Sequence, residues 1–173
     1  ITPMLMKRYS MKSEIGVGLV ASSFALGRFC TTSCWPILSD FIGRRKVLFM
    51  ALLGGVVGSA LQGVAIACCW PFAAFLVVRG VSGMFSGIVP VVKAYIVDAF
   101  DAEEVPKVLA YREAAGTMAF IIGPALGGAL ASRTLSAPMF FSACTGAVAA
   151  VLALKVLPEP IQRRSGKGPK KST

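Results

Sequence analysis

Histidine is absent from this chain of 173 residues, and charged side chains make up only 15% of it. A soluble domain usually has about 25% charged residues. Without histidine, and with few acidic residues, the chain lacks the clustered groups on which a membrane enzyme or a zinc site depends. The five cysteines are an odd number and lie in or beside apolar stretches, which argues against a disulfide framework. We therefore expect no metal, no cofactor and no enzymatic activity.

Hydrophobic residues, by contrast, make up 55% of the chain and give it a mean hydropathy of +0.73. They gather in five blocks of about 20 residues or more, the length that an α-helix needs to cross a bilayer. The blocks are 15–38, 47–70, 71–97, 109–132 and 134–157. Lipid-exposed backbone must satisfy its own hydrogen bonds, and the blocks lack the alternation of a barrel strand. The sequence predicts an all-α, polytopic bundle of membrane helices over residues 1–158.

The chain has 18 Lys and Arg residues against 8 Asp and Glu, a net charge of +10. Such a charge would suit nucleic-acid binding, but the basic residues lie between and after the apolar blocks, where the positive-inside rule explains them. The loop after the first block carries Arg44, Arg45 and Lys46, whereas the loop between the last two carries only Arg133. We expect a multi-pass protein of the plasma or vacuolar membrane, with a basic cytosolic tail at 159–173 and no nucleic-acid partner.

The chain begins with Ile1 rather than Met and contains an odd number of predicted spans. Its first apolar block is too long for a signal peptide. We expect the chain to be a fragment of a longer membrane protein. A natural truncated product that does not transport, and that assembles with or regulates other proteins, is the alternative.

The loop between the first two blocks has the sequence LSDFIGRRK over residues 38–46. A glycine permits a tight turn there, and an acid at one helix end facing basic residues at the next makes a compact charged clasp. The segment resembles the loop signature of the major facilitator superfamily of secondary transporters, Gly-x-Leu-Ala-Asp-Arg-x-Gly-Arg-Arg/Lys. The matching residues are Leu38, Asp40, Gly43, Arg44 and Arg45. Pro36 and Phe41 stand where that family usually has glycine and arginine.

Two further segments resemble signatures of the same superfamily. Residues 79–83 (RGVSG) are similar to the intramembrane Arg-x-x-x-Gly element of its proton-coupled members, and residues 123–128 (GPALGG) to the Gly-Pro-x-x-Gly-Gly signature of its antiporters. The three motifs occur in the family's order. The resemblance implies helices two to six of a twelve-helix architecture, that is, the N-terminal half without its first helix. Drug/proton antiporters and zinc-induced facilitator-like proteins are the branches that look most similar.

Arg79 is a charge in the middle of an apolar block, where insertion scales assign it a cost of about 2.5–3.5 kcal/mol. At about 100° per residue, one face of a continuous helix would carry Arg79, Ser82, Ser86 and Lys93. We predict that this polar stripe lines a hydrated cavity and that Arg79 engages substrate or assists proton coupling, as the resemblance implies. Snorkelling or structural pairing of Arg79 is the alternative. Arg28, in the first block, is predicted either to line the same cavity or to pair structurally.

Small residues dominate one face of the fourth block. This seam contains Gly116, Gly123 and Gly127, and Gly128 lies beside it. Faces of small residues let membrane helices approach closely. Pro124 lacks a backbone donor and is expected to kink the helix. We predict a pivot between two halves that rock around a central site, with plain helix packing as the alternative.

Asp40 and Arg44 are expected to form the charged clasp, with Asp98 as a candidate third member. The resemblance implies that this cluster holds the outward-facing conformation by contacting the second half of the transporter. Gln62, in the second block, is expected to hydrogen-bond across helices in a packing role, typically worth about 0.6 kcal/mol.

The leading hypothesis is transport of a small solute by alternating access, with proton-coupled antiport as the mode that the resemblance implies. The expected partners are the lipid bilayer, a small-molecule substrate, protons and the missing second half. Asp98 and Glu113 lie near block ends rather than deep inside, so a proton-carrying carboxylate is expected in the missing parts. An uncoupled facilitator of sugars or organic ions remains open.

Overall fold

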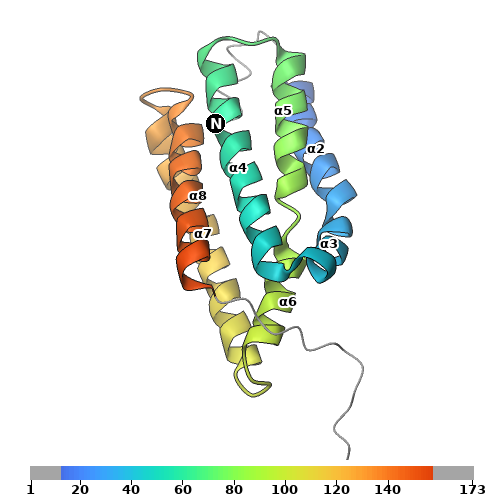
Figure 1. The fold of residues 1–173 in the computed structure, drawn as a ribbon. Coiled ribbons are helices and arrows are strands. Elements are labelled where there is room, and N and C mark those ends of the chain that lie inside the picture. The colour runs from blue at the N-terminus through green and yellow to red at the C-terminus, as the bar shows by residue number, and fades with distance from the viewer. Residues whose placement is uncertain (1–12, 158–173) are drawn as a thin grey trace, which may run out of the picture.

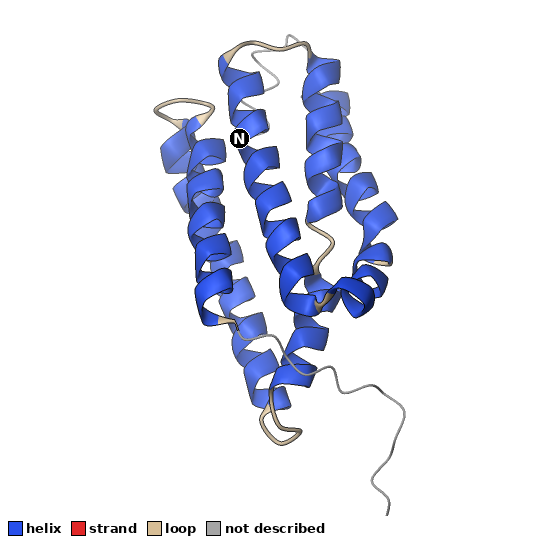
Figure 2. Cartoon of the chain, in the orientation of Figure 1, coloured by secondary structure: helices blue, strands red, loops and turns tan. Residues whose placement is uncertain are grey.

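The computed structural model describes residues 13–157, and helices account for nearly all of that range (Figure 2). The elements are α2 (Ser13–Thr32), α3 (Cys34–Ile42), α4 (Arg44–Ala67), α5 (Phe72–Phe85), α6 (Val89–Ala99), α7 (Val105–Ala131) and α8 (Ala137–Val156). The predicted all-α fold is confirmed. The predicted basic tail, 159–173, lies outside the described residues.

Four of the five predicted spans coincide with helical segments that are long and apolar enough to cross a membrane. Among the described residues these are Arg44–Ala67, Phe72–Ala99, Val105–Ala131 and Ala137–Val156. The first predicted span, 15–38, is divided between α2 and α3 at Ser33. Pro36 lacks the N–H that a continuous helix would donate back to Thr32, which explains the interruption. The fifth crossing therefore stays a prediction.

The third span is interrupted as well. Its first part, α5, ends at Phe85, and α6 begins at Val89 with a proline at its start. Because Pro90 has no N–H to donate to Ser86, the α-helical ladder cannot run through this point. Ser86 instead donates its N–H to the Gly83 carbonyl at 3.0 Å, a tighter turn than an α-helix makes. The interruption resets the rotational phase of the residues that follow.

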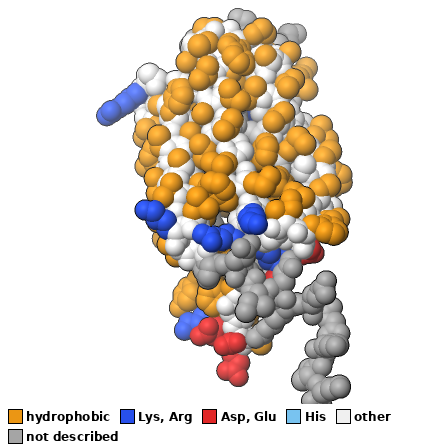
Figure 3. All heavy atoms as spheres, in the orientation of Figure 1, with side chains coloured by type: hydrophobic (Ala, Val, Ile, Leu, Met, Phe, Trp, Pro, Cys, Tyr) orange, Lys and Arg blue, Asp and Glu red, His pale blue; other side chains and the backbone are white. Residues whose placement is uncertain are grey.

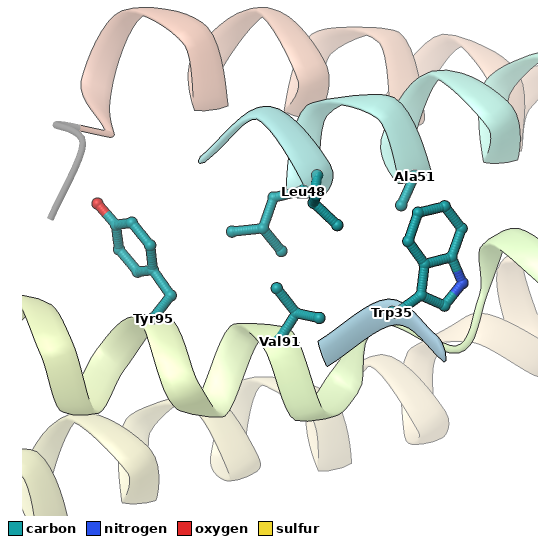
Figure 4. Packing of buried hydrophobic residues seen from close by; sticks show 6 residues of the cluster. Trp35, Leu48, Ala51, Val91 and Tyr95 are labelled. Atoms are coloured by element: carbon teal, nitrogen blue, oxygen red, sulfur yellow. The ribbon is translucent and has the colours of Figure 1, made fainter. Parts of the chain in front are cut away.

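The helices pack around α4, with α8 along one side and α5 along the other (Figure 1). Beyond α5 lies α2, while α7 packs mainly against α6 and α8 among the helices of the described range. A cluster of buried side chains joins α3, α4 and α6 (Figure 4). Its members are Trp35, Val47, Leu48, Ala51, Val91 and Tyr95. Large apolar side chains also cover the outside of the bundle, as expected for helices that face lipid.

The two ends of the bundle differ in charge. The turn at Gly43, the loop after α6 and the end of α8 lie at the lower end in Figure 1, and the loops after α4 and α7 lie at the upper end. Lys and Arg side chains gather at the lower end, beneath a broad band of hydrophobic side chains (Figure 3). This asymmetry supports a multi-pass membrane protein whose lower end is predicted to be cytoplasmic.

The α2 and α5 backbones approach each other very closely through glycines. A Cβ atom at Gly27 would lie 2.0 Å from the carbonyl oxygen of Gly80, and one at Gly83 would lie 2.3 Å from the carbonyl oxygen of Phe24. Both obstacles are backbone atoms, which cannot turn aside as a flexible side chain can. Only glycine fits these positions, so the contact fixes how α5 presents its residues to the interior.

We expect Gly27→Ala to push α2 away from α5 and to destabilise the folded protein by about 1–3 kcal/mol, the usual range for overpacking. Gly18→Ala is the matched control on the same helix, because a Cβ atom there meets nothing within 4 Å. The measurement is the thermal midpoint of each variant in detergent. Equal midpoints for the two variants would contradict the close approach.

Candidate functional site

A cavity of about 510 Å³ lies among α2, α4, α5 and α8. Its polar lining consists of Ser59, Gln62, Arg79, Ser82, Ser86 and Ser142. Phe24, Phe85 and Met139 contribute apolar surface. Arg79 is the one charged residue in this lining among the residues that the structure describes. Within the same range, no three His, Cys, Asp or Glu side chains come together in a way that could hold a metal ion.

Three neighbours hold the Arg79 guanidinium inside the bundle. Its Nη1 donates to the Gln62 side-chain oxygen at 2.7 Å, and its Nε donates to the Val20 carbonyl oxygen at 3.3 Å. Its central carbon lies 5.3 Å from the centroid of the Phe24 ring, within cation–π range. The charge is thus positioned by α2 and α4 although the residue belongs to α5.

Gln62 is the residue that orients Arg79. Its side chain is buried, and its Nε2 donates to the Gly58 carbonyl at 3.2 Å and to Ser82 Oγ at 2.7 Å. Ser82 Oγ in turn donates to the Arg79 carbonyl at 3.2 Å. With both N–H contacts made, the amide oxygen is directed at the guanidinium.

The expectation that Gln62 hydrogen-bonds across helices is confirmed by its contacts with Ser82 and Arg79 of α5, but the sequence alone did not identify Arg79 as its partner. The available signal was that Ser59 and Gln62 are the only residues with a hydroxyl or amide side chain in 47–70, and that they lie about one helical turn apart.

Of the four residues on the predicted polar stripe of the third span, three line the cavity. Arg79, Ser82 and Ser86 line the cavity, and Ser86 Oγ donates to the Gly83 carbonyl at 2.7 Å. Lys93 does not line it; its half-exposed ammonium pairs with Glu113 on α7 at 3.2 Å. The break after Phe85 changes the rotational phase of α6, so Lys93 does not continue the stripe, and its part in the solute pathway stays a prediction.

Arg28 also lies away from the cavity. The residue is exposed on α2 and is absent from the cavity lining. Its neighbours at positions 27 and 31 face α5 instead, where Thr31 Oγ1 donates to the Met84 carbonyl at 2.7 Å. The suggestion that Arg28 lines this cavity is therefore not supported by the described residues. No ion pair involving it occurs among them either, so a pairing role has no partner in this range.

The charged residues of the loop motif meet at the lower end of the bundle. Gly43 joins α3 to α4 with a φ of 107°, a conformation that favours glycine. This turn brings Arg44 to 3.2 Å from the Asp40 carboxylate, and the same guanidinium also pairs with Asp98 of α6. The Asp98 side chain is 11% exposed and that of Asp40 is 60% exposed. We call Asp40, Arg44 and Asp98 the charged clasp.

Arg45, the next residue of the motif, does not join the clasp. Its Nη2 donates to the Leu154 carbonyl of α8 instead. A single step of about 100° along the helix separates the two arginines, which explains why they contact different neighbours.

The glycine face of α7 is open in the described part of the chain. A Cβ atom at Gly116, Gly123 or Gly128 would meet nothing within 4 Å, and most residues of α7 are exposed. The helix runs through Pro124 from Val105 to Ala131. No helix of the described range packs on this face, so the predicted seam, Gly127 included, and its pivot role stay predictions.

Comparison with known proteins gives a consistent result. All of residues 1–173 match the family model described as Major Facilitator Superfamily. The chain is 32% identical over 160 residues to Multidrug resistance protein 1 of Bacillus subtilis, covering 92% of this chain and 40% of that protein. It is 33% identical over 133 residues to Protein ZINC INDUCED FACILITATOR-LIKE 1 of Arabidopsis thaliana, covering 76% of this chain and 27% of that protein. The chain thus spans less than half the length of these relatives.

We expect Gln62→Leu to destabilise the protein by about 1–3 kcal/mol, because it leaves a guanidinium N–H without its acceptor and removes the donor to the Ser82 oxygen. Ser142→Ala changes the same cavity from α8 without touching this network and should leave stability near that of the wild type. Thermal unfolding in detergent measures both. A Gln62→Leu variant as stable as Ser142→Ala would contradict the positioning role.

Both clasp carboxylates are expected to matter for transport, but unequally. Asp98→Asn should impair transport more than Asp40→Asn, because the Asp98 pair is largely buried whereas an exposed pair contributes only about 0–1 kcal/mol. Both variants should still insert into the membrane at normal levels. Transport rates normalised to the inserted amount provide the comparison, and full activity of Asp98→Asn would refute a role for the clasp.

Proposed function

The chain belongs to the major facilitator superfamily of membrane transporters, and from this membership we propose that it forms part of the wall of a solute pathway that works by alternating access. The observation that carries the proposal is the Arg79 guanidinium, which three helices hold at the cavity between α2, α4, α5 and α8. A charge placed so far inside an apolar bundle is a candidate functional group by default, because it is costly to maintain there.

The cavity suits an amphipathic organic solute. Aromatic and thioether surface from Phe24, Phe85 and Met139 can cover an apolar part of such a molecule, and the serine hydroxyls can bond a polar part. Arg79 has five N–H donors, of which Gln62 and Val20 engage two in the described residues. The others can bond a carbonyl or anionic group. The relatives' names, which refer to multidrug resistance, support a substrate of this class.

We further propose that transport is coupled to protons and runs as antiport. The similarity of residues 79–83 to the element of proton-coupled members supports this mode. The cavity lining in the described residues contains no carboxylate, so the proton carrier would belong to another part of the full transporter, and Arg79 would act by changing its interactions as that carrier gains or loses a proton. Uncoupled facilitation of sugars or organic ions is the competing mode.

The clasp and the open face of α7 fit the same cycle. Arg44 ties the α3–α4 turn to α6 at the lower end, so the clasp would stabilise one of the two conformations. The glycine face of α7, open along Gly116, Gly123 and Gly128, would be the sliding surface against the rest of the transporter. Both roles require a second half of the protein, which the longer relatives have the length to contain.

We expect Arg79→Ala to reduce transport by the full-length protein in sealed vesicles at least about tenfold, a change equivalent to about 1.4 kcal/mol, because the cavity loses the one cation that the described residues contribute to its lining. Arg79→Lys should restore little of the lost transport, since lysine lacks the planar guanidinium with its forked N–H donors. Arg133→Gln, which removes a charge from the loop after α7, is the matched control and should transport normally.

Running the same assay with and without a pH gradient separates the two modes. Antiport predicts that collapsing the gradient stops accumulation against a concentration difference, whereas facilitation is indifferent to it. Unchanged transport and unchanged pH dependence in Arg79→Ala would refute the assignment of Arg79 to the pathway.

A further inference from the structure

A second cavity, of about 450 Å³, lies at the lower end of the bundle between the start of α4 and the end of α8. Its lining consists of Arg45, Lys46, Phe49, Met50 and Leu154. None of these residues lines the cavity that contains Arg79. The two cavities therefore share no lining residue.

The polar part of this lining is entirely basic. Arg45 and Lys46 lie in the first turn of α4, where unpaired backbone N–H groups add further positive potential. Arg45 Nη2 is bound to the Leu154 carbonyl, but its Nε is buried and has no hydrogen-bond partner within the part of the chain that the structure describes. A buried donor without an acceptor is costly. An anionic oxygen in the cavity would satisfy it.

The remaining walls are apolar, which indicates that the anion belongs to a lipid rather than to a soluble molecule. Phe49 and Met50 follow the basic residues along α4, and Leu154 faces them from α8. Moving along α4 away from the lower end, the cavity changes from basic to apolar, the order in which a phospholipid presents its headgroup and its acyl chain. A soluble anion would use the basic part alone.

We propose that this cavity binds an anionic phospholipid. Its phosphate would lie against Arg45 and Lys46, and the part of an acyl chain nearest the headgroup would lie against Phe49 and Leu154. Basic pockets between membrane helices at the cytoplasmic surface are suited to such lipids. A lipid held there would bridge α4 and α8 next to the charged clasp, since Arg45 directly follows Arg44.

The test uses the full-length protein in a neutral detergent, titrated with phosphatidylglycerol or with phosphatidylcholine of the same acyl chains, and native mass spectrometry counts the bound lipids. Phosphatidylglycerol should bind more tightly. Lys46→Gln should weaken its binding about fivefold, the effect of one basic residue at a membrane surface, and Arg45→Gln at least as much. Lys107→Gln removes one exposed positive charge from the start of α7, outside the cavity, and should leave the affinity unchanged.

Any one of three results would overturn the proposal. Equal binding of the two lipids would show that no anionic headgroup is recognised. An equal loss in Lys107→Gln and Lys46→Gln would show a general effect of surface charge. Competition by glycerol 3-phosphate at the concentration at which phosphatidylglycerol binds would show a site for soluble anions.

If Arg45→Gln unfolds, Lys46→Gln decides the matter, because Lys46 is exposed and can be replaced without opening the core. Lipid binding is measured without transport, so its failure and a failure of the proposed function remain distinguishable.

Discussion

The structure depends on keeping one guanidinium inside an apolar helix bundle. The hydrogen bonds from Arg79 to Gln62 and Val20 exist because α4 and α2 both lie within reach of α5, and the approach of α2 is set by glycine contacts with no room for a Cβ atom. The polar network and the glycine contacts therefore support each other. Widening the gap between α2 and α5 would lengthen the bond to Val20, while losing Gln62 would leave an unpaired charge in an environment that tolerates it poorly.

Two breaks in the helices separate the residues that line the cavity from those at the lower end of the bundle. Pro36 and Pro90 each follow an interruption, and each interruption separates residues near the middle of the bundle from residues at its lower end. Ser82 above the second break and Ser86 within it line the cavity; below the break, Lys93 pairs with Glu113 and Asp98 pairs with Arg44. One predicted span thus contributes to two different charged sites because its two parts have different rotational phases.

The helices and their class could be predicted from the sequence because lipid imposes a strong rule on length and apolarity, and the loop motif could be located because a glycine turn between charges is a local feature. The position of Lys93 outside the cavity and the identity of the partners of Gln62 could not be derived from the sequence, for one shared reason. Both required knowledge of how the helices are rotated against one another, which depends on contacts between residues far apart in sequence, such as Gly27 with Gly80. The open face of α7 shows the converse, since a pattern of small residues predicts a contact surface but does not name its partner.

The adjacent arginines of the loop motif show why a motif alone does not assign a role. Arg44 and Arg45 have the same chemistry and follow one another, yet the first pairs with two carboxylates and the second contacts a carbonyl of α8 beside an apolar cavity. The Arg44 charge is compensated by Asp40 and Asp98 within the described residues. The Arg45 charge has no such compensation there, and its environment changes from basic to apolar along α4. Since both residues belong to the first turn of α4, this one helix end is tied to α6 through Arg44 and to α8 through Arg45.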